Sequence, residues 1–328
     1  MTTASLGTGT LTHPTTGPDA STASLLIPAT LGAPASLKKQ RRNWSGWLFV
    51  GPFMLLFALV FIAPLAYAIF LSLFRETLVG GNSFVGLENY GLALTDPKFW
   101  DAIIRVSVFL LVQVPIMLLL ALFAALALDS ARLRWVGFYR LSIFLPYAVP
   151  GVVAVMIWGY MYGTQFGLVA DLNRFFGLHL PSPMAPNLIM AAIGNIVTWE
   201  FAGYNMLIFF SALKAIPQDL YEAAEIDGAG AFRTIFAIKL PSIRGALIIA
   251  TVFSVIGSFQ LFNEPSILQT IAPNSFTSYF TPNMYAFNLS FAGSQFNYAA
   301  AIAIISGVIT MVVAYLVQLA GEKKEKLV

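Results

Sequence analysis

Long stretches without a charged residue alternate with short basic stretches along this chain. Four charge-free runs of 19 to 32 residues cover positions 43–74, 106–128, 141–170 and 245–263. Because about 20 apolar residues in a helix cross the hydrocarbon core of a bilayer, each run predicts a membrane span. Two further runs are less uniform. Residues 187–213 are apolar apart from Glu200, and the charge-free run 265–321 is apolar only in its second half.

The pattern as a whole predicts an all-α integral membrane protein with six transmembrane helices. The predicted helices cover approximately residues 47–73, 103–128, 142–163, 188–213, 245–264 and 297–320.

Composition and charge agree with this class and add an orientation. The chain is 58% hydrophobic, has a mean hydropathy of +0.78 and is only 10% charged, where a soluble domain has about 25% charged residues. Of its 18 Lys and Arg residues, 14 lie before the first helix, after the second and fourth helices, or after the sixth. Short basic loops stay in the cytoplasm, so both termini are predicted to be cytoplasmic. The net charge of +3 reflects this bias, and no nucleic-acid partner is expected.

The predicted organisation is one membrane domain with two tails. Residues 1–37 contain no Lys or Arg and are rich in Thr, Ser, Ala, Gly and Pro, so we expect residues 1–43 to form a disordered cytoplasmic tail. Residues 44–320 form the six-helix domain, and 321–328 a short cytoplasmic tail.

The sequence offers little catalytic chemistry. It has no cysteine, no Gly-Lys pair for a phosphate-binding loop, and two isolated histidines, His13 and His179. We therefore expect no enzyme activity, and neither a cofactor nor a metal bound by this chain. Such a membrane protein is a channel, a secondary transporter, a subunit of a larger machine, or a scaffold.

The loop between the fourth and fifth helices, residues 214–243, carries the most informative motif. Pro217 suits the first turn of a short helix, and Gly228 suits its left-handed C-terminal cap. A second short helix is expected from about 231 to 238, before Pro241. Asp219, Glu222 and Glu225, spaced by three, would make one side of the first helix acidic, which is suited to a partner's groove. Alternatively, these acids only complement the positive end of their own helix.

The loop follows the pattern E-A-A, three residues, G, nine residues, I-x-L-P. It resembles the signature of the membrane subunits of binding-protein-dependent ABC importers. The seven positions that carry the resemblance are Glu222, Ala223, Ala224, Gly228, Ile238, Leu240 and Pro241. Other segments resemble sugar permeases of the maltose and glycerol-phosphate type, namely 144–147, Trp158, 166–168, Trp199 with 203–205, and 298–301.

The resemblance implies a type I ABC importer permease fold in the bacterial plasma membrane, with core helices over about 99–320. It implies that loop 214–243 couples this subunit to a dimer of cytoplasmic ATPases, which carry the ATP and Mg. It also implies a second permease subunit, in most cases a different chain, and an extracytoplasmic binding protein that delivers a carbohydrate.

Carbohydrate recognition requires amide or carboxylate side chains that match sugar hydroxyls, beside an aromatic platform. Each candidate could instead be a packing or interfacial residue, and Glu200 could be protonated or paired with a neighbouring amide. Glu200 is also a costly acid within a span, which makes it a functional candidate. The substrate-path candidates are Trp158, Trp199, Glu200, Tyr204, Asn205, Gln260, Asn263 and Glu264.

Two alternatives to the importer remain at this point. A secondary sugar transporter would use intramembrane acids such as Glu200 and Glu264 for ion coupling, but it needs more spans or inverted repeats. A membrane scaffold would account for the hydrophobicity but not for the loop motif. The sequence leaves open which sugar is carried and which permease subunit holds it.

Overall fold

The computed structural model describes residues 45–77, 81–130 and 133–325. The predicted tail 1–43 lies outside the described residues. The chain divides into two units, Met1–Met54 and Leu55–Val328, and the helices discussed below from α2 onward all belong to the second unit. The helices are α1 (Ser45–Phe57), α2 (Ala63–Ser72), α3 (Glu88–Thr95), α4 (Pro97–Leu128), α5 (Val136–Phe144), α6 (Gly151–Met161), α7 (Leu168–Phe176), α8 (Ile189–Lys214), α9 (Gln218–Ile226), α10 (Ala231–Thr234), α11 (Leu240–Ser242), α12 (Arg244–Phe259), α13 (Asn263–Ile271), α14 (Pro282–Phe291) and α15 (Phe296–Glu325).

Four helices in the described part of the chain are long and apolar enough to cross a membrane. They are Gly46–Ser72, which joins α1 and α2 through the π-helical turn Ala58–Ile62, and then Pro97–Leu128, Ile189–Lys214 and Phe296–Glu322. These agree with the predicted first, second, fourth and sixth helices. The C-terminal helix continues to Glu325, so the start of the predicted tail 321–328 is helical.

The predicted third helix, 142–163, is wrong as a single straight element. The segments Val136–Ala148 and Gly151–Met161 meet at 95°. Proline cannot donate the helical hydrogen bond and forces the preceding residue toward an extended conformation, and Val149 before Pro150 has ψ 131°. Pro146 and Pro150 cause the break. A count of apolar residues does not detect it, because such a count ignores the backbone effect of proline.

The predicted fifth helix, 245–264, is also corrected. Helix α12 ends at Phe259, and α13 begins at Asn263, so Asn263 and Glu264 lie in the first turn of a separate helix. At its N-terminal end, α12 meets the segment Ala231–Ser242 at an angle of 65°. With each bent pair counted as one span, up to six spans are possible.

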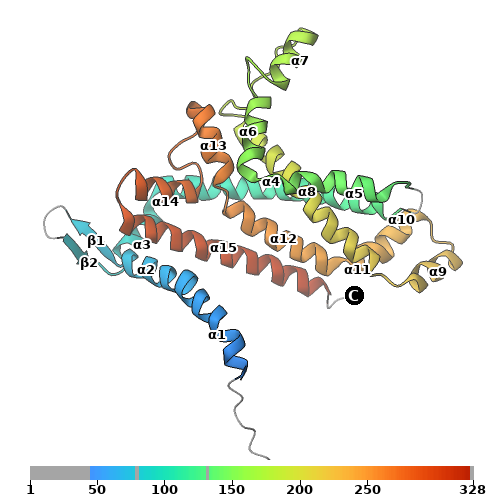
Figure 1. The fold of residues 1–328 in the computed structure, drawn as a ribbon, viewed down its shortest axis with the longest axis horizontal. Helices are drawn as coiled ribbons and strands as arrows, with labels where there is room; N and C mark the ends of the chain where they lie inside the picture. Colours follow the sequence, from blue (N-terminus) through green and yellow to red (C-terminus); the bar gives the residue numbers. More distant parts are fainter. Residues whose placement is uncertain (1–44, 78–80, 131–132, 326–328) are drawn as a thin grey trace, which may run out of the picture. The chain divides into compact units, whose positions relative to one another are not determined.

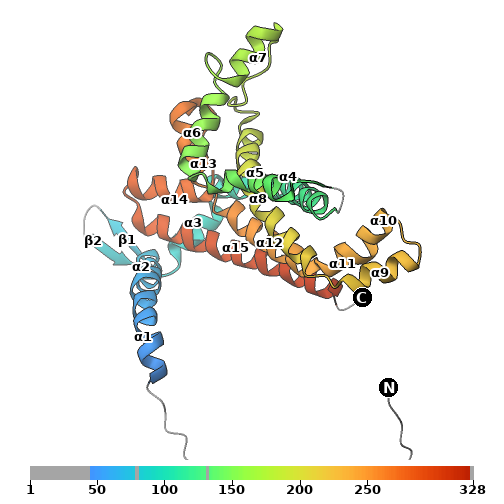
Figure 2. The same cartoon turned by 45° about the vertical axis from the view of Figure 1, so that its right-hand side comes forward.

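Several short elements were not predicted. A hairpin pairs β1 (Phe74–Thr77) with β2 (Gly81–Phe84) in antiparallel register, with Phe74 opposite Phe84. The hairpin, α3 and α14 lie at one end of α15, and α9 to α11 lie at its other end (Figures 1 and 2). The second unit therefore has two separate groups of short elements, one at each end of its long helices.

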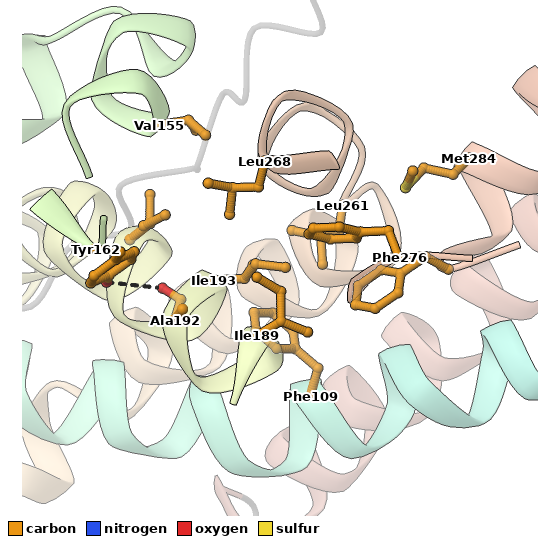
Figure 3. Packing of buried hydrophobic residues seen from close by; sticks show 12 residues of the cluster. Phe109, Val155, Tyr162, Ile189, Ala192, Ile193, Leu261, Leu268, Phe276 and Met284 are labelled. Carbon is orange, nitrogen blue, oxygen red and sulfur yellow. Dashed lines mark hydrogen bonds between the residues drawn. The ribbon is translucent and has the colours of Figure 1, made fainter. Parts of the chain in front are cut away.

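Buried apolar side chains hold the long helices together. Figure 3 shows one cluster, in which Phe109 of α4, Ile193 of α8 and Leu268 of α13 converge. The hydroxyl of Tyr162 donates to the carbonyl oxygen of Ala192 in the same region. A second cluster joins α4, α8 and α12 near loop 214–243 and includes Phe209, which is fully buried. Loop 214–243 is thus connected to a well-packed set of helices.

Asp96 joins three helices at the start of α4. Its carboxylate accepts hydrogen bonds from the backbone N–H of Lys98 (2.9 Å), the hydroxyl of Tyr285 (2.5 Å) and the hydroxyl of Tyr298 (2.9 Å). Burial alone raises the pKa of this carboxyl, but the tyrosine and backbone hydrogen bonds and the charge of Lys98 together hold the pKa below its ordinary value. The ionised form is therefore favoured by folding.

We expect acid to remove this contribution to stability. Because the folded pKa of Asp96 is lowered, the contribution is complete above the ordinary pKa of about 4 and is lost as the pH falls below it. Asp96→Asn should lower the melting temperature at pH 7 and should lose less stability than wild type on acidification to pH 3.5. Melting of the purified protein in detergent measures both. The control is Glu88→Gln in the exposed pair with Arg75, and an equal acid response in wild type and Asp96→Asn would contradict the assignment.

Candidate functional site

Loop 214–243 folds as two helical segments around a left-handed glycine. Helix α9 follows Pro217, and Gly228 has φ +71°, so the predicted cap is confirmed. The side chains of Asp219, Glu222 and Glu225 are exposed. Ala223 and Gly228 are exposed as well, whereas Ala224 is buried. The structure therefore presents acids on the outside of α9 and packs a small residue inward.

The second segment of the loop is longer than predicted. The helix does not stop at 238 but runs from α10 through a π-helical turn, Ile235–Lys239, into α11. Pro241 lies at the start of α11, where its missing N–H is tolerated. Ile238, Leu240 and Pro241 are half-buried.

Large apolar side chains are exposed beside the acids. Ile226 is 88% exposed and Phe232 is 80% exposed, and Leu220 and Phe236 are exposed as well. An exposed apolar group next to charged side chains is typical of a protein interaction site. Sequence reasoning identified the acids but not these apolar residues, although Phe232 and Ile226 flank the glycine.

Five of the eight substrate-path candidates line one cavity of about 400 Å³ between α4, α8, α12 and α13. We call it the polar cavity. Its wall also contains apolar groups, among them Phe109 and Phe253. The candidates that it brings together are Tyr204, Asn205, Gln260, Asn263 and Glu264.

The other three candidates do not line the polar cavity. Trp158 and Trp199 contact each other edge to face, with ring centroids 5.8 Å apart. Glu200 is buried, and its carboxylate lies beside Gly151 at the start of α6. Among the described residues, neither Trp158 Nε1 nor Glu200 Oε2 has a hydrogen-bond partner. These are the polar atoms that we would expect a water molecule or a ligand to satisfy.

The polar cavity also contains residues that sequence reasoning missed. Tyr147 stacks on Tyr204 with ring centroids 4.8 Å apart and an interplanar angle of 20°. Gln113 of α4 lies in the wall, and its amide donates to the hydroxyl of Thr198 (3.3 Å). Ser254 and Ser258 complete the polar lining. A glutamine inside the charge-free run 106–128 was a signal for Gln113. Tyr147 is brought to the cavity by the short 3₁₀ turn Leu145–Ala148, just before the break at Pro150.

No group of three or more His, Asp or Glu residues that could hold a metal ion occurs in the ranges that the structure describes. The polar cavity has hydroxyl, amide and carboxylate groups together with stacked aromatic rings. This arrangement can bind and orient a polar uncharged molecule.

Comparison with known proteins agrees with this architecture. Residues 90–325 match the family described as binding-protein-dependent transport system inner membrane component. The chain is 32% identical over 287 residues to the lactose transport system permease protein LacF of Rhizobium radiobacter, covering 85% of this chain and 93% of that protein. It is 30% identical over 290 residues to the sulfoquinovosyl glycerol transport system permease protein SmoG of Agrobacterium fabrum, covering 84% and 93%.

A solved structure supports the fold. It is a bacterial ABC transporter involved in the import of the acidic polysaccharide alginate, and one of its chains superimposes with a TM-score of 0.73 at 17% identity, covering 86% of this chain and 96% of that chain. Apart from the hairpin, the predicted helical permease fold is therefore confirmed. The family match and the two permease relatives confirm the interpretation as a transport subunit with its ATPase on another chain. The chain belongs to the family of binding-protein-dependent transport system inner membrane components, as a multi-pass permease subunit of an ABC importer in the bacterial inner membrane.

Proposed function

We propose that this permease forms half of the membrane pathway for a carbohydrate, which an extracytoplasmic binding protein delivers. The observation that carries the proposal is the polar cavity. Its volume of about 400 Å³ is within the usual range of small-ligand sites, about 300–1,000 Å³. The names of the relatives, which transport lactose and sulfoquinovosyl glycerol, support the same class of substrate.

The chemistry of the cavity fits a sugar. Sugar hydroxyls both donate and accept hydrogen bonds. The amides of Gln260 and Asn263 can likewise donate and accept, and the carboxylate of Glu264 can accept. The stacked rings of Tyr147 and Tyr204 provide a flat surface for the apolar face of a sugar ring. Trp158, Trp199 and Glu200 would act next to this site rather than in its wall.

We infer six spans, with each bent pair counted as one, and both termini in the cytoplasm. The excess of Lys and Arg before the first helix and after the second, fourth and sixth supports this orientation. The domain then runs over 44–320 with its core at about 99–320, between cytoplasmic tails at 1–43 and 321–328. A second permease subunit, of a different chain, would supply the other half of the pathway.

In this orientation loop 214–243 faces the cytoplasm and couples the permease to an ATPase dimer, which holds the ATP and Mg. A groove of that partner would accept two kinds of side chain from the loop. These are the acids Asp219, Glu222 and Glu225 and the apolar residues Ile226 and Phe232. Both kinds of side chain are exposed in this chain. The shape of the contact would be set by the seven motif positions, which are Glu222, Ala223, Ala224, Gly228, Ile238, Leu240 and Pro241.

The test is uptake of a panel of labelled sugars by cells with and without this gene. We expect one sugar class to be lost in the deletion strain. For a sugar of that class, the Asn263→Ala variant should show a KM for uptake about tenfold higher than wild type. This corresponds to the loss of one hydrogen bond worth about 1–1.5 kcal/mol. The control is Asn173→Ala in α7, whose amide bonds the backbone of Leu180 outside the polar cavity. An unchanged KM in Asn263→Ala would count against the site, and retention of all sugars by the deletion strain would refute the function.

A further inference from the structure

The residue that follows α4 and caps its C-terminal end is a buried carboxylate that binds two lysines. The side chain of Asp129 is 8% exposed. Lys239 Nζ lies 2.6 Å from Asp129 Oδ2, and Lys214 Nζ lies 2.8 Å from Oδ1. Lys214 is the last residue of α8, and Lys239 ends the π-helical turn before α11. Both ends of loop 214–243 therefore meet at one side chain of a third helix.

The three charges depend on one another. A carboxylate at the C-terminal end of a helix is opposed by the negative end of the helix dipole, and a buried charge needs a partner. Lys239 is itself only 15% exposed, so its ammonium group relies on Asp129 in turn. By contrast, the surface pair Asp171–Arg174 is 3.7 Å apart with both side chains largely in solvent. Exposed pairs of that kind contribute little.

The same lysine reaches helix α9. Lys239 Nζ lies 5.6 Å from the ring centroid of Tyr221, which precedes Glu222 of the motif. Burial and the charge of Asp129 both raise the pKa of the Tyr221 hydroxyl, which agrees with a position close to the anion. Lys239 also occupies the unspecified position between Ile238 and Leu240. The motif therefore leaves the residue type at this position open, while the positions on either side of it are specified.

Covalent connections join loop 214–243 to α8 and α12, but not to α4. Helix α4 packs along α8 and contributes Gln113 to the wall of the polar cavity. We propose that Asp129 is a positioning residue that, through Lys239 and Lys214, fastens loop 214–243 to α4 and transmits its movement to the polar cavity. This inference rests on the proposed coupling of the loop to an ATPase.

The test uses the complete transporter, with its ATPase, partner permease and binding protein, reconstituted in lipid vesicles. We expect Asp129→Asn to reduce uptake at least tenfold while ATP hydrolysis stays within about twofold of wild type. The ATP hydrolysed per sugar imported should then rise at least fivefold. Asp129→Glu should restore the wild-type ratio. A merely unstable variant would lower uptake and hydrolysis together and leave this ratio unchanged.

Paired variants make the assignment specific. Lys239→Met should raise the ratio as Asp129→Asn does, and the double variant should be no worse than either one, since both remove the same interaction. Lys214→Met should have a smaller effect, because that side chain is 57% exposed. Asp171→Asn, which removes a carboxylate from the surface pair in α7, should match wild type.

The outcomes separate this inference from the proposed function. If the wild-type transporter imports no carbohydrate, the proposed function is overturned and this inference with it. If wild type imports a sugar and Asp129→Asn keeps the wild-type ratio of ATP to sugar, at any level of uptake, the transmitting role of Asp129 alone is overturned.

Discussion

Replacing Gly228 by valine is expected to abolish uptake while the permease still inserts into the membrane. Gly228 has φ +71°, a conformation that a β-branched residue adopts only under strain. Within the described residues, nothing lies within 4 Å of the position that a Cβ would take, so the added Cβ itself meets no neighbouring atom. The cost is therefore one of backbone conformation, and it falls on the turn between α9 and α10.

The turn sets the direction of α9 relative to the segment Ala231–Ser242. If valine forces this turn into another conformation, Glu222 and Ile226 leave the surface that we propose to contact the ATPase. The long helices are held by buried clusters that do not include Gly228, so their packing should persist. We expect uptake to fall more than tenfold at matched protein level.

Gly228→Asn is the matched control, because asparagine adopts the left-handed conformation more readily than other non-glycine residues. It should retain most of the uptake, although it adds a side chain at the same position. The measurement is uptake of the transported sugar together with the amount of permease in isolated membranes. Equal uptake by the valine and wild-type proteins would show that the turn geometry does not matter for coupling.

The parts of the fold that sequence predicted best are those determined by continuous composition. Helices α4, α8 and α15 are single helices that each contain all or most of one apolar run, so counting charges located most of each helix. The break between α5 and α6 depends on two prolines, a local backbone effect that hydropathy does not include. The end of α12 at Phe259 has no such signal, because residues 260–263 are uncharged whether helical or not.

The site was predictable to the extent that its chemistry is concentrated in a few apolar segments. Tyr204, Asn205 and Gln260 were identified because amide and aromatic side chains suit sugar recognition and these segments resemble sugar permeases, and the fold brings them to one cavity. The pairing of Asp129 with Lys239 joins positions 110 residues apart. No periodicity relates them, so the basic residues were interpreted only as signals of orientation.

Gly203→Ala should be the most damaging single-methyl substitution that we consider. A Cβ at Gly203 in α8 would overlap the carbonyl oxygen of Ile143 and the Cα of Phe144 at the end of α5. Because these are backbone atoms, no side-chain rotation relieves the overlap, and the two helices must separate. Overpacking of this kind costs about 1–3 kcal/mol, and we expect the upper part of that range.

Gly194→Ala on the same helix provides the control. Its Cβ would lie 3.5 Å from side-chain atoms of Gln113 and Phe109, an ordinary contact. Both substitutions gain about 1 kcal/mol of helix propensity, so the difference between their melting temperatures isolates the overlap at the helix crossing. Melting in detergent should therefore show Gly194→Ala close to wild type and Gly203→Ala well below it.

The effect on uptake should exceed the effect on stability. The short 3₁₀ turn Leu145–Ala148 that continues α5 carries Tyr147, whose ring stacks on Tyr204 next to Gly203. Separation of α5 from α8 would pull these two rings apart and change the wall of the polar cavity even in molecules that remain folded. We expect uptake per folded molecule to fall in Gly203→Ala but not in Gly194→Ala. If both variants have wild-type melting temperatures and uptake, the close crossing of α8 and α5 is not required, and the stacked tyrosines do not depend on it.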